Sequence, residues 1–107
     1  MNRGTYHILK QIEWYNKLSK TCEFVELEHW FYNYKVDVYA KMNDGKILVI
    51  EIGEVKQSKL DMLVALAGTG KITLIRRLIP NNLKFAKPID RDVVTDTVFP
   101  KDFKWNR

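Results

Sequence analysis

Two acidic residues of this chain, Asp37 and Glu51, stand at positions from which they could act on the same ligand. Residues 35–41 alternate apolar and polar side chains with a period of two, as expected of a β-strand. Residues 46–53 are almost wholly apolar except for Glu51, a composition typical of a strand that is covered on both faces. The sequence therefore predicts that each acid lies on its own strand of one hairpin.

The turn between these strands determines how the two acids face each other. Residues 43–45 are Asn-Asp-Gly, which suits a three-residue hairpin loop whose glycine adopts the left-handed conformation. If Met42 then faces Lys46, Asp37 lies directly across from Glu51 on the same face of the sheet. Facing Cβ atoms are roughly 5 Å apart, a separation at which like charges destabilise a sheet.

Two interpretations of this acidic pair are open. The carboxylates could stand on a solvated face, but the apolar run around Glu51 argues against exposure, and carboxylates are rarely buried without a partner. Alternatively they share a divalent cation, because hard oxygen ligands suit Mg²⁺ or Mn²⁺ and the cation would cancel the repulsion. We favour the metal site, since buried like charges mark functional sites.

The composition narrows the class of protein that could hold such a site. With 107 residues, 46% of them hydrophobic and 29% charged, the chain is expected to form one globular domain. No apolar run approaches the roughly 20 residues of a membrane span. Residues 1–10 lack the apolar core of a signal peptide, so we expect a cytoplasmic protein with no membrane partner. Cys22 is the only cysteine, which excludes an internal disulfide, and a net charge of +5 favours a polyanionic partner.

Before the hairpin, the pattern predicts a helix over residues 6–20 with Thr5 as its cap. Its apolar stripe, at helical spacing, is expected to pack on the rest of the domain and consists of Ile8, Ile12, Tyr15 and Leu18. Glu13 lies beside this stripe. It is either an exposed partner of Lys17 or an additional acid near the metal.

Residues 21–31 return to alternation and predict a strand, with Cys22, Phe24 and Leu27 facing one way. Four aromatic residues crowd the turn that follows, namely Trp30, Phe31, Tyr32 and Tyr34. These side chains could stack on bases. Packing at the edge of the core is the commoner use of such residues, and we expect it here.

After the hairpin, a second helix is predicted over residues 59–67, with Ser58 and Asp61 as a capping box. A strand over residues 71–78 follows, and it should run parallel to a neighbour because a helix connects it to the hairpin. Residues 67–73 only faintly match a phosphate-binding loop and follow a helix instead of preceding one, so no nucleotide cofactor is expected. We expect residues 1–79 to form the core and residues 80–107 a basic and aromatic extension that packs on it or on a partner subunit.

The order of helix, three strands, helix and strand, with an Asp in the second strand and a Glu in the third, resembles the PD-(D/E)xK nuclease superfamily. The closest likeness is to small archaeal Holliday junction resolvase-like nucleases, and it rests on residues 36–40, 43–45 and 49–52. The resemblance implies an α/β fold with a restriction-endonuclease-like αβββαβ core, in which helices flank a mixed sheet. It also implies that the protein is a homodimer that hydrolyses DNA phosphodiester bonds.

The resemblance further implies the residues of the active site. Asp37, Glu51 and the carbonyl of Ile52 would coordinate Mg²⁺ or Mn²⁺, and Glu13 matches a further acid of the first helix. The family pattern then requires a lysine two residues after its glutamate, where this chain has Gly53.

Two lysines near the start of the second helix, Lys56 and Lys59, are the available substitutes for the missing one. We prefer Lys59, because a long side chain at a helix start can reach back over the strand end and stabilise charge on a phosphate. Glu54 is a candidate to orient these groups. The alternative function is a member of the fold without catalytic activity, acting as a DNA-binding or protein-interaction module. A third is a structural protein whose basic tail contacts a partner.

Overall fold

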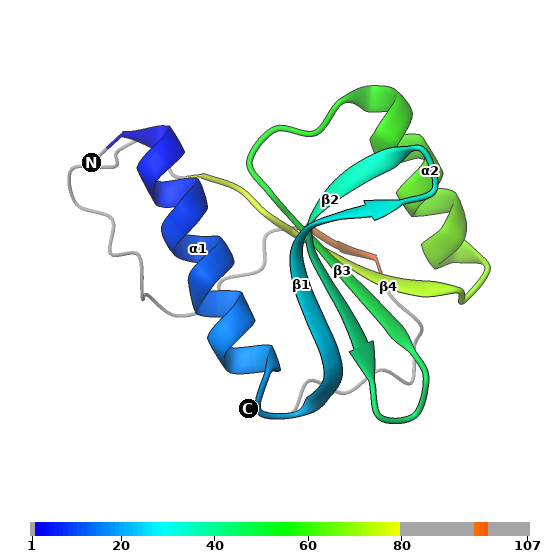
Figure 1. The fold of residues 1–107 in the computed structure, drawn as a ribbon. Helices are drawn as coiled ribbons and strands as arrows, with labels where there is room; N and C mark the ends of the chain where they lie inside the picture. The colour runs from blue at the N-terminus through cyan, green and yellow to red at the C-terminus, as the bar shows by residue number, and fades with distance from the viewer. Residues whose placement is uncertain (1, 80–95, 99–107) are drawn as a thin grey trace.

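The computed structural model describes residues 2–79 and 96–98 and shows an α/β fold (Figure 1). The helices and strands follow the order expected from the sequence, with a short strand added at the end. They are α1 (Arg3–Leu18), β1 (Cys22–Phe31), β2 (Tyr34–Met42), β3 (Ile47–Ile52), α2 (Gln57–Gly68), β4 (Ile72–Arg77) and β5 (Asp96–Val98). Three residues of the C-terminal extension therefore belong to the same sheet as the core.

The strands form one mixed sheet in the order β1-β2-β3-β4-β5. Strand β2 pairs antiparallel with both β1 and β3, whereas β3 and β4 are parallel. The parallel pair is the one that α2 connects, which confirms the prediction that a crossover helix would produce it. Strand β5 pairs antiparallel with β4.

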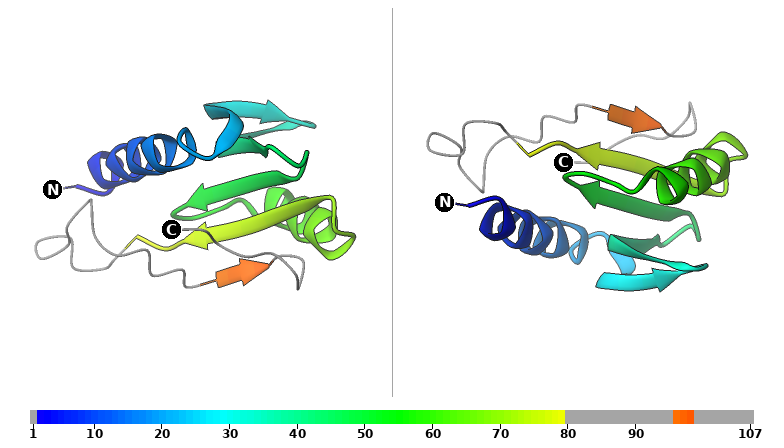
Figure 2. Two further views of the ribbon diagram at one scale, coloured as in Figure 1. Left: turned by 90° about the horizontal axis from the view of Figure 1, so that it is seen from below. Right: turned by 90° about the horizontal axis from the view of Figure 1, so that it is seen from above.

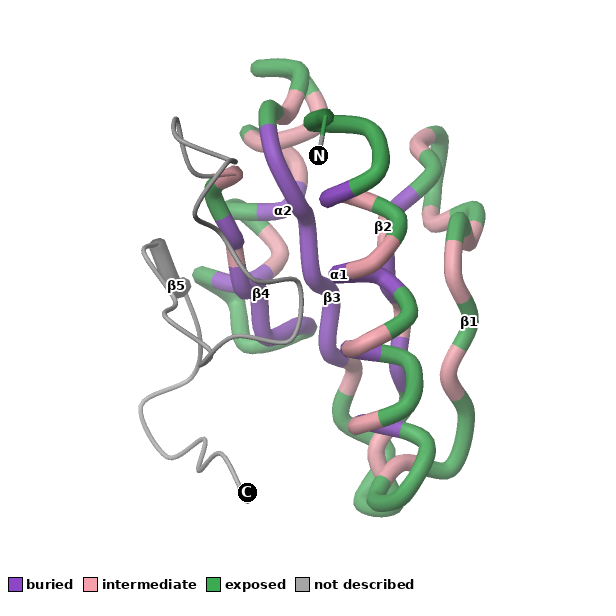
Figure 3. The backbone as a smooth tube through the Cα atoms, turned by 90° about the vertical axis from the view of Figure 1, so that its left-hand side faces the viewer, coloured by how far each residue is buried: buried purple, intermediate pink, exposed green. Residues whose placement is uncertain are grey.

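The two helices cover opposite faces of the sheet (Figure 2). The α1-side cluster consists of Trp14, Leu18, Val38, Ala40, Leu48, Ile50, Ile52 and Ile75. The α2-side cluster consists of Val36, Val49, Leu63, Ala67, Ile72 and Leu74. Because β3 contributes to both clusters, it is buried along most of its length, as Figure 3 shows and as its apolar sequence predicted.

The hairpin of β2 and β3 has the predicted turn and register. Met42 N donates to Lys46 O at 2.8 Å, and Gly45 lies in the left-handed region with φ 87°. Ladder partners run from Lys41 opposite Ile47 to Val38 opposite Ile50. Continued by one residue, this register brings Asp37 to Glu51, as the sequence indicated.

The boundaries and packing face of the first helix differ from the prediction. The helix begins at Arg3, because Asn2 Oδ1 accepts a hydrogen bond from Thr5 N at 2.7 Å and so Asn2, not Thr5, is the cap. Ile8, Ile12 and Tyr15 are 56%, 45% and 41% exposed. The buried face instead consists of Tyr6, Lys10, Gln11, Trp14 and Leu18. The expected stripe is therefore wrong except for Leu18.

Strand β1 and the turn after it also differ in part from the expectation. Phe24 is exposed, and the residues of this strand that pack on the α1-side cluster include Val25 and Leu27. Of the four aromatic residues near the turn, Trp30 and Tyr32 are 66% and 64% exposed, so the expectation of core packing is wrong for these two.

The capping box expected for α2 is absent, because the helix begins before it. The N-cap is Lys56, which makes no side-chain capping bond. Ser58 Oγ accepts from Tyr34 Oη at 2.9 Å, and Asp61 Oδ1 accepts from Gln57 Nε2 at 2.7 Å. The bond from Tyr34 ties α2 to β2, whereas the bond from Gln57 lies within the helix. Within the residues described, neither helix is long and apolar enough to cross a membrane.

Candidate functional site

An open pocket of about 450 Å³ lies at the carboxyl end of β3. Its walls come from the first turns of α1, Asp37 of β2, the end of β3, the connection to α2, the first turn of α2 and Ile79. They consist of Arg3, Gly4, His7, Asp37, Glu51, Ile52, Gly53, Glu54, Val55, Lys56, Lys59 and Ile79. The structure therefore brings both acids and both candidate lysines to one cavity.

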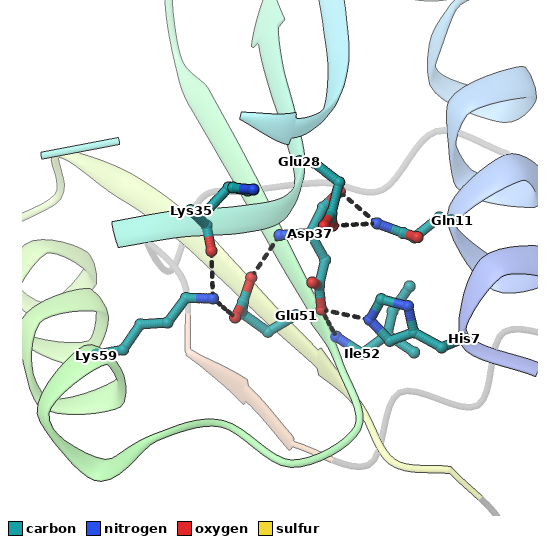
Figure 4. A network of polar contacts seen from close by, with 8 residues as sticks. All are labelled: His7, Gln11, Glu28, Lys35, Asp37, Glu51, Ile52 and Lys59. Carbon is teal, nitrogen blue, oxygen red and sulfur yellow. Dashed lines mark hydrogen bonds and ion pairs between the residues drawn. The ribbon is translucent and has the colours of Figure 1, made fainter. Parts of the chain in front are cut away.

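Glu51 is the buried acid of this pocket, with only 1% of its surface exposed. Its Oε2 atom accepts a hydrogen bond from the backbone N–H of Asp37 at 2.7 Å, and its Oε1 atom forms an ion pair with Lys59 Nζ (Figure 4). The same ammonium donates to the carbonyl oxygen of Lys35. Both oxygens of Glu51 are thus held by partners from β2 and α2.

Burial raises the pKa of Glu51, and the nearby charge of Asp37 raises it further. The hydrogen bond and positive charge of Lys59 and the amide of Asp37 lower it in part. For a carboxylate that is buried beside a like charge, a nearby cation stabilises the ionised form. Lys59 supplies one such cation.

Asp37 is held by other partners than Glu51. Its Oδ2 atom accepts from the backbone N–H of Ile52 at 2.7 Å and lies 3.1 Å from His7 Nε2. Figure 4 shows His7 approaching this carboxylate from α1, while Lys59 approaches Glu51 from α2. The acidic pair is therefore positioned from both layers of helices.

The prediction that both acids stand on one face of the sheet is wrong, because the alternation of β2 slips at Asp37. Val36 packs in the α2-side cluster, whereas Val38 packs in the α1-side cluster. In a regular strand, residues two apart face the same way. The slip lets the side chain of Asp37 reach His7, although its backbone still touches Glu51.

Gly53 occupies the position where the family pattern has a lysine, and its backbone explains the difference. Its φ is 85°, in the left-handed region, and its N–H donates to Arg77 O at 2.8 Å. An added Cβ would lie 3.0 Å from Ile79 Cδ1. A lysine would be strained here, and the ammonium that reaches Glu51 comes from Lys59 instead.

The remaining predicted residues have varied positions. Glu13 pairs with Lys10 Nζ at 3.1 Å, not with Lys17, and does not belong to the pocket lining. Lys56 and Glu54 line the pocket and are exposed. Ile52 also lines it, with its N–H directed to Asp37.

Two residues that contact Asp37 were not predicted from the sequence, namely His7 and Gln11. Gln11 Nε2 donates to the carbonyl oxygen of Asp37 at 3.1 Å. The signal for both was their spacing, since they continue the helical line of Trp14 and Leu18 toward the start of the helix. The more apolar line through Ile8 and Ile12 concealed it.

The donor set suits a small hard cation. Mg²⁺ binds through one or two carboxylates and keeps several waters, so Asp37 and Glu51 at an open pocket meet its requirement. Larger clusters are not found: in the part of the chain that the structure describes, no three His, Cys, Asp or Glu residues are grouped to hold a metal. Any such cation would therefore rest on two carboxylates, main-chain oxygen and water.

In comparisons with protein-family models, with curated proteins and with solved structures, nothing matches this chain. The likeness to nucleases rests on the acidic hairpin and the order of the elements alone.

Proposed function

We propose that this protein is a metal-dependent nuclease that hydrolyses DNA phosphodiester bonds. The observation that carries the proposal is the placement of Asp37 and Glu51 in one open pocket, with the ammonium of Lys59 on Glu51. Mg²⁺ or Mn²⁺ bound there would activate a water and neutralise the attacked phosphate. The order of the elements, which is α1, three antiparallel strands, α2 and a parallel strand, supports a restriction-endonuclease-like core.

Six residues of the pocket have roles in this proposal. Asp37, Glu51 and the carbonyl of Ile52 would hold the cation. Lys59 stabilises the charge that develops on the phosphate, which is the task of the family lysine that Gly53 replaces. Arg3 and Lys56 on the pocket wall attract the DNA backbone, so binding should weaken as salt is added.

The proposal is tested by incubating supercoiled, linear and four-way-junction DNA with the protein and Mn²⁺ or Mg²⁺, with EDTA as the blank. We expect cleavage that Asp37→Asn and Glu51→Gln both abolish. Asp44→Asn is the matched control, because Asp44 lies exposed in the turn of the same hairpin. This variant should cleave DNA as the unmodified protein does. The absence of cleavage on every DNA, together with no Mn²⁺ binding in calorimetry, would refute the proposal.

One observation favours the alternative of a DNA-binding or protein-interaction module without catalysis. The carboxylates already accept bonds from Ile52 N, Asp37 N and Lys59 Nζ, so protein groups alone can hold the pair together. A module of this kind would bind DNA, or a protein, equally well in EDTA and in Mn²⁺.

The resemblance to the PD-(D/E)xK nucleases also supports a homodimer, which sedimentation at two protein concentrations would test.

A further inference from the structure

Gln11 connects α1 to both strands of the β1–β2 hairpin at the level of Asp37. The residue is buried, with 6% of its surface exposed. Its Nε2 atom donates to Glu28 Oε2 at 2.7 Å and to the carbonyl oxygen of Asp37 at 3.1 Å (Figure 4). One amide group thus satisfies two acceptors from neighbouring strands.

The sheet is irregular at the point that Gln11 contacts. The β1–β2 ladder passes from Leu27 opposite Val38 to His29 opposite Val36, without a pairing of the residues between. Glu28, one of these two residues, has a φ of 53°, in the left-handed region. Such a backbone costs of order 1–3 kcal/mol in a residue with a side chain, and it persists only where its surroundings hold it.

Asp37 is the other skipped residue, and it lies outside the β2–β3 ladder as well, which begins at Val38. The polar groups of Asp37 form hydrogen bonds with the side chains of Glu51 and Gln11 and with the backbone at the end of β3 instead. Its N–H donates to Glu51 Oε2, its carbonyl accepts from Gln11, and its carboxylate accepts from Ile52 N. The orientation of the carboxylate therefore depends on contacts made after the ladder has ended.

We infer that Gln11 is the positioning residue of Asp37, a role that rests on the proposed metal-dependent function. Its amide fixes the peptide that follows Asp37, so the N–H and the carboxylate of that residue stay aligned with Glu51 and Ile52. Without the donor, the peptide can rotate, and the bonds on both sides of Asp37 loosen. Partners that orient metal ligands in this way typically change metal affinity by about 10–100-fold.

Three variants separate this role from a general contribution to stability. Gln11→Glu keeps the shape of the side chain but replaces the donor by an acceptor, facing Glu28 and a carbonyl. Gln57→Glu is the matched control, because Gln57 Nε2 also donates to a carboxylate, that of Asp61, on the exposed surface of α2. Gln11→Leu removes the donor without adding a charge and serves if the glutamate prevents folding.

A charge-neutral exchange, Gln11→Glu with Glu28→Gln, distinguishes positioning from tethering. It restores an amide–carboxylate bond between α1 and β1, but leaves the carbonyl of Asp37 without its donor. If Gln11 only ties the helix to the strand, the exchange should behave as the unmodified protein. If Gln11 positions Asp37, the exchange should resemble Gln11→Glu.

The first measurement is amide hydrogen exchange by NMR without metal. Exchange at the N–H groups of Asp37 and Ile52 should become at least about ten-fold faster in Gln11→Glu, Gln11→Leu and the exchanged pair. The N–H groups of Val49 and Leu74 in the core should keep their rates, as should all of these groups in Gln57→Glu. Unchanged rates at Asp37 and Ile52 in either single variant, or recovery in the exchanged pair, would overturn the inference.

The second measurement is the affinity for Mn²⁺ by calorimetry, which should fall about 10–100-fold in the same variants and not in Gln57→Glu. The two readouts keep the proposals apart. If the unmodified protein binds no Mn²⁺, the proposed function fails, while amide exchange still decides the role of Gln11. If Mn²⁺ binds equally to all the variants, Gln11 does not position a metal ligand.

Discussion

The two carboxylates of the pocket are positioned by different means. On the α2 side, Glu51 belongs to the regular, buried strand β3 and meets the charge of Lys59. On the α1 side, Asp37 lies outside the ladders at an irregular point of the sheet, next to His7 and the uncharged amide of Gln11. The α2 side thus contributes a positive charge next to Glu51, and the α1 side contributes a hydrogen bond that orients Asp37.

This difference follows from what each helix brings to the sheet. Lys59 lies in the first turn of α2, where a long side chain can turn back toward the end of β3. The polar residues of α1 lie on its buried face, in line with Trp14 and Leu18, so their positions are set by core packing. A change on the α2 side should therefore affect the proposed DNA cleavage most, and a change at the surface of α1 should affect the protein least.

After the two acids themselves, the largest effect is expected for Lys59. Lys59→Ala should lower the kcat of the proposed DNA cleavage by about 10²–10³-fold, because it removes the only lysine ammonium that the structure places on Glu51 among the described residues. Lys56→Ala is the control from the same pocket and should change kcat by about two-fold at most. The test is single-turnover cleavage with saturating Mg²⁺. Equal losses in the two variants would show that neither lysine replaces the one missing at Gly53.

An effect of intermediate size is expected at Gly53, the link between β3 and α2. Gly53→Ala should lower the free energy of unfolding by about 1–2 kcal/mol from its left-handed backbone, and more from the contact of the new Cβ with Ile79. Gly45→Ala is the control, since its φ is 87° but nothing lies within 4 Å of the added Cβ. Urea denaturation measures both. A smaller loss at Gly53 than at Gly45 would contradict our account of why the lysine is absent there.

The α2 side of the site could be predicted from the sequence, and the α1 side could not. The turn at residues 43–45, the register of the hairpin and the parallel pairing of β4 all follow from local patterns. On α1, periodicity predicted the stripe through Ile8 and Ile12, which is exposed, because the line through Gln11 and Trp14 that is buried is the less apolar of the two. The irregularity at Asp37 could not be predicted either. It coincides with the left-handed backbone of Glu28, and no residue around Glu28 in the sequence indicates such a backbone.

The buried charge on the α2 side should appear in the pH dependence of stability. Because the pKa of Glu51 is raised in the folded protein, the folded state binds more protons than the unfolded state between the ordinary glutamate pKa and the raised one. The contribution of Glu51 to stability should thus fall as the pH rises through this window, by at most about 1.4 kcal/mol per pH unit.

The contribution of Glu51 is isolated by subtracting the free energy of unfolding of Glu51→Gln from that of the unmodified protein at each pH, in EDTA. The difference should decrease as the pH rises above the usual range of a glutamate and then level off. A difference that increases with pH would mean that Lys59 and the Asp37 amide outweigh the burial of Glu51.

The smallest effect is expected on the outer face of α1. Ile12→Gln should change the free energy of unfolding by less than about 0.5 kcal/mol, because the side chain is 45% exposed and the helix packs through Trp14 and Leu18. Ile8→Gln, one turn earlier and 56% exposed, should behave in the same way. Urea denaturation at low protein concentration gives both values. A loss of about 2 kcal/mol or more, the size that truncating a buried isoleucine produces, would show that α1 packs through its more apolar stripe after all, and that Gln11 does not face Asp37.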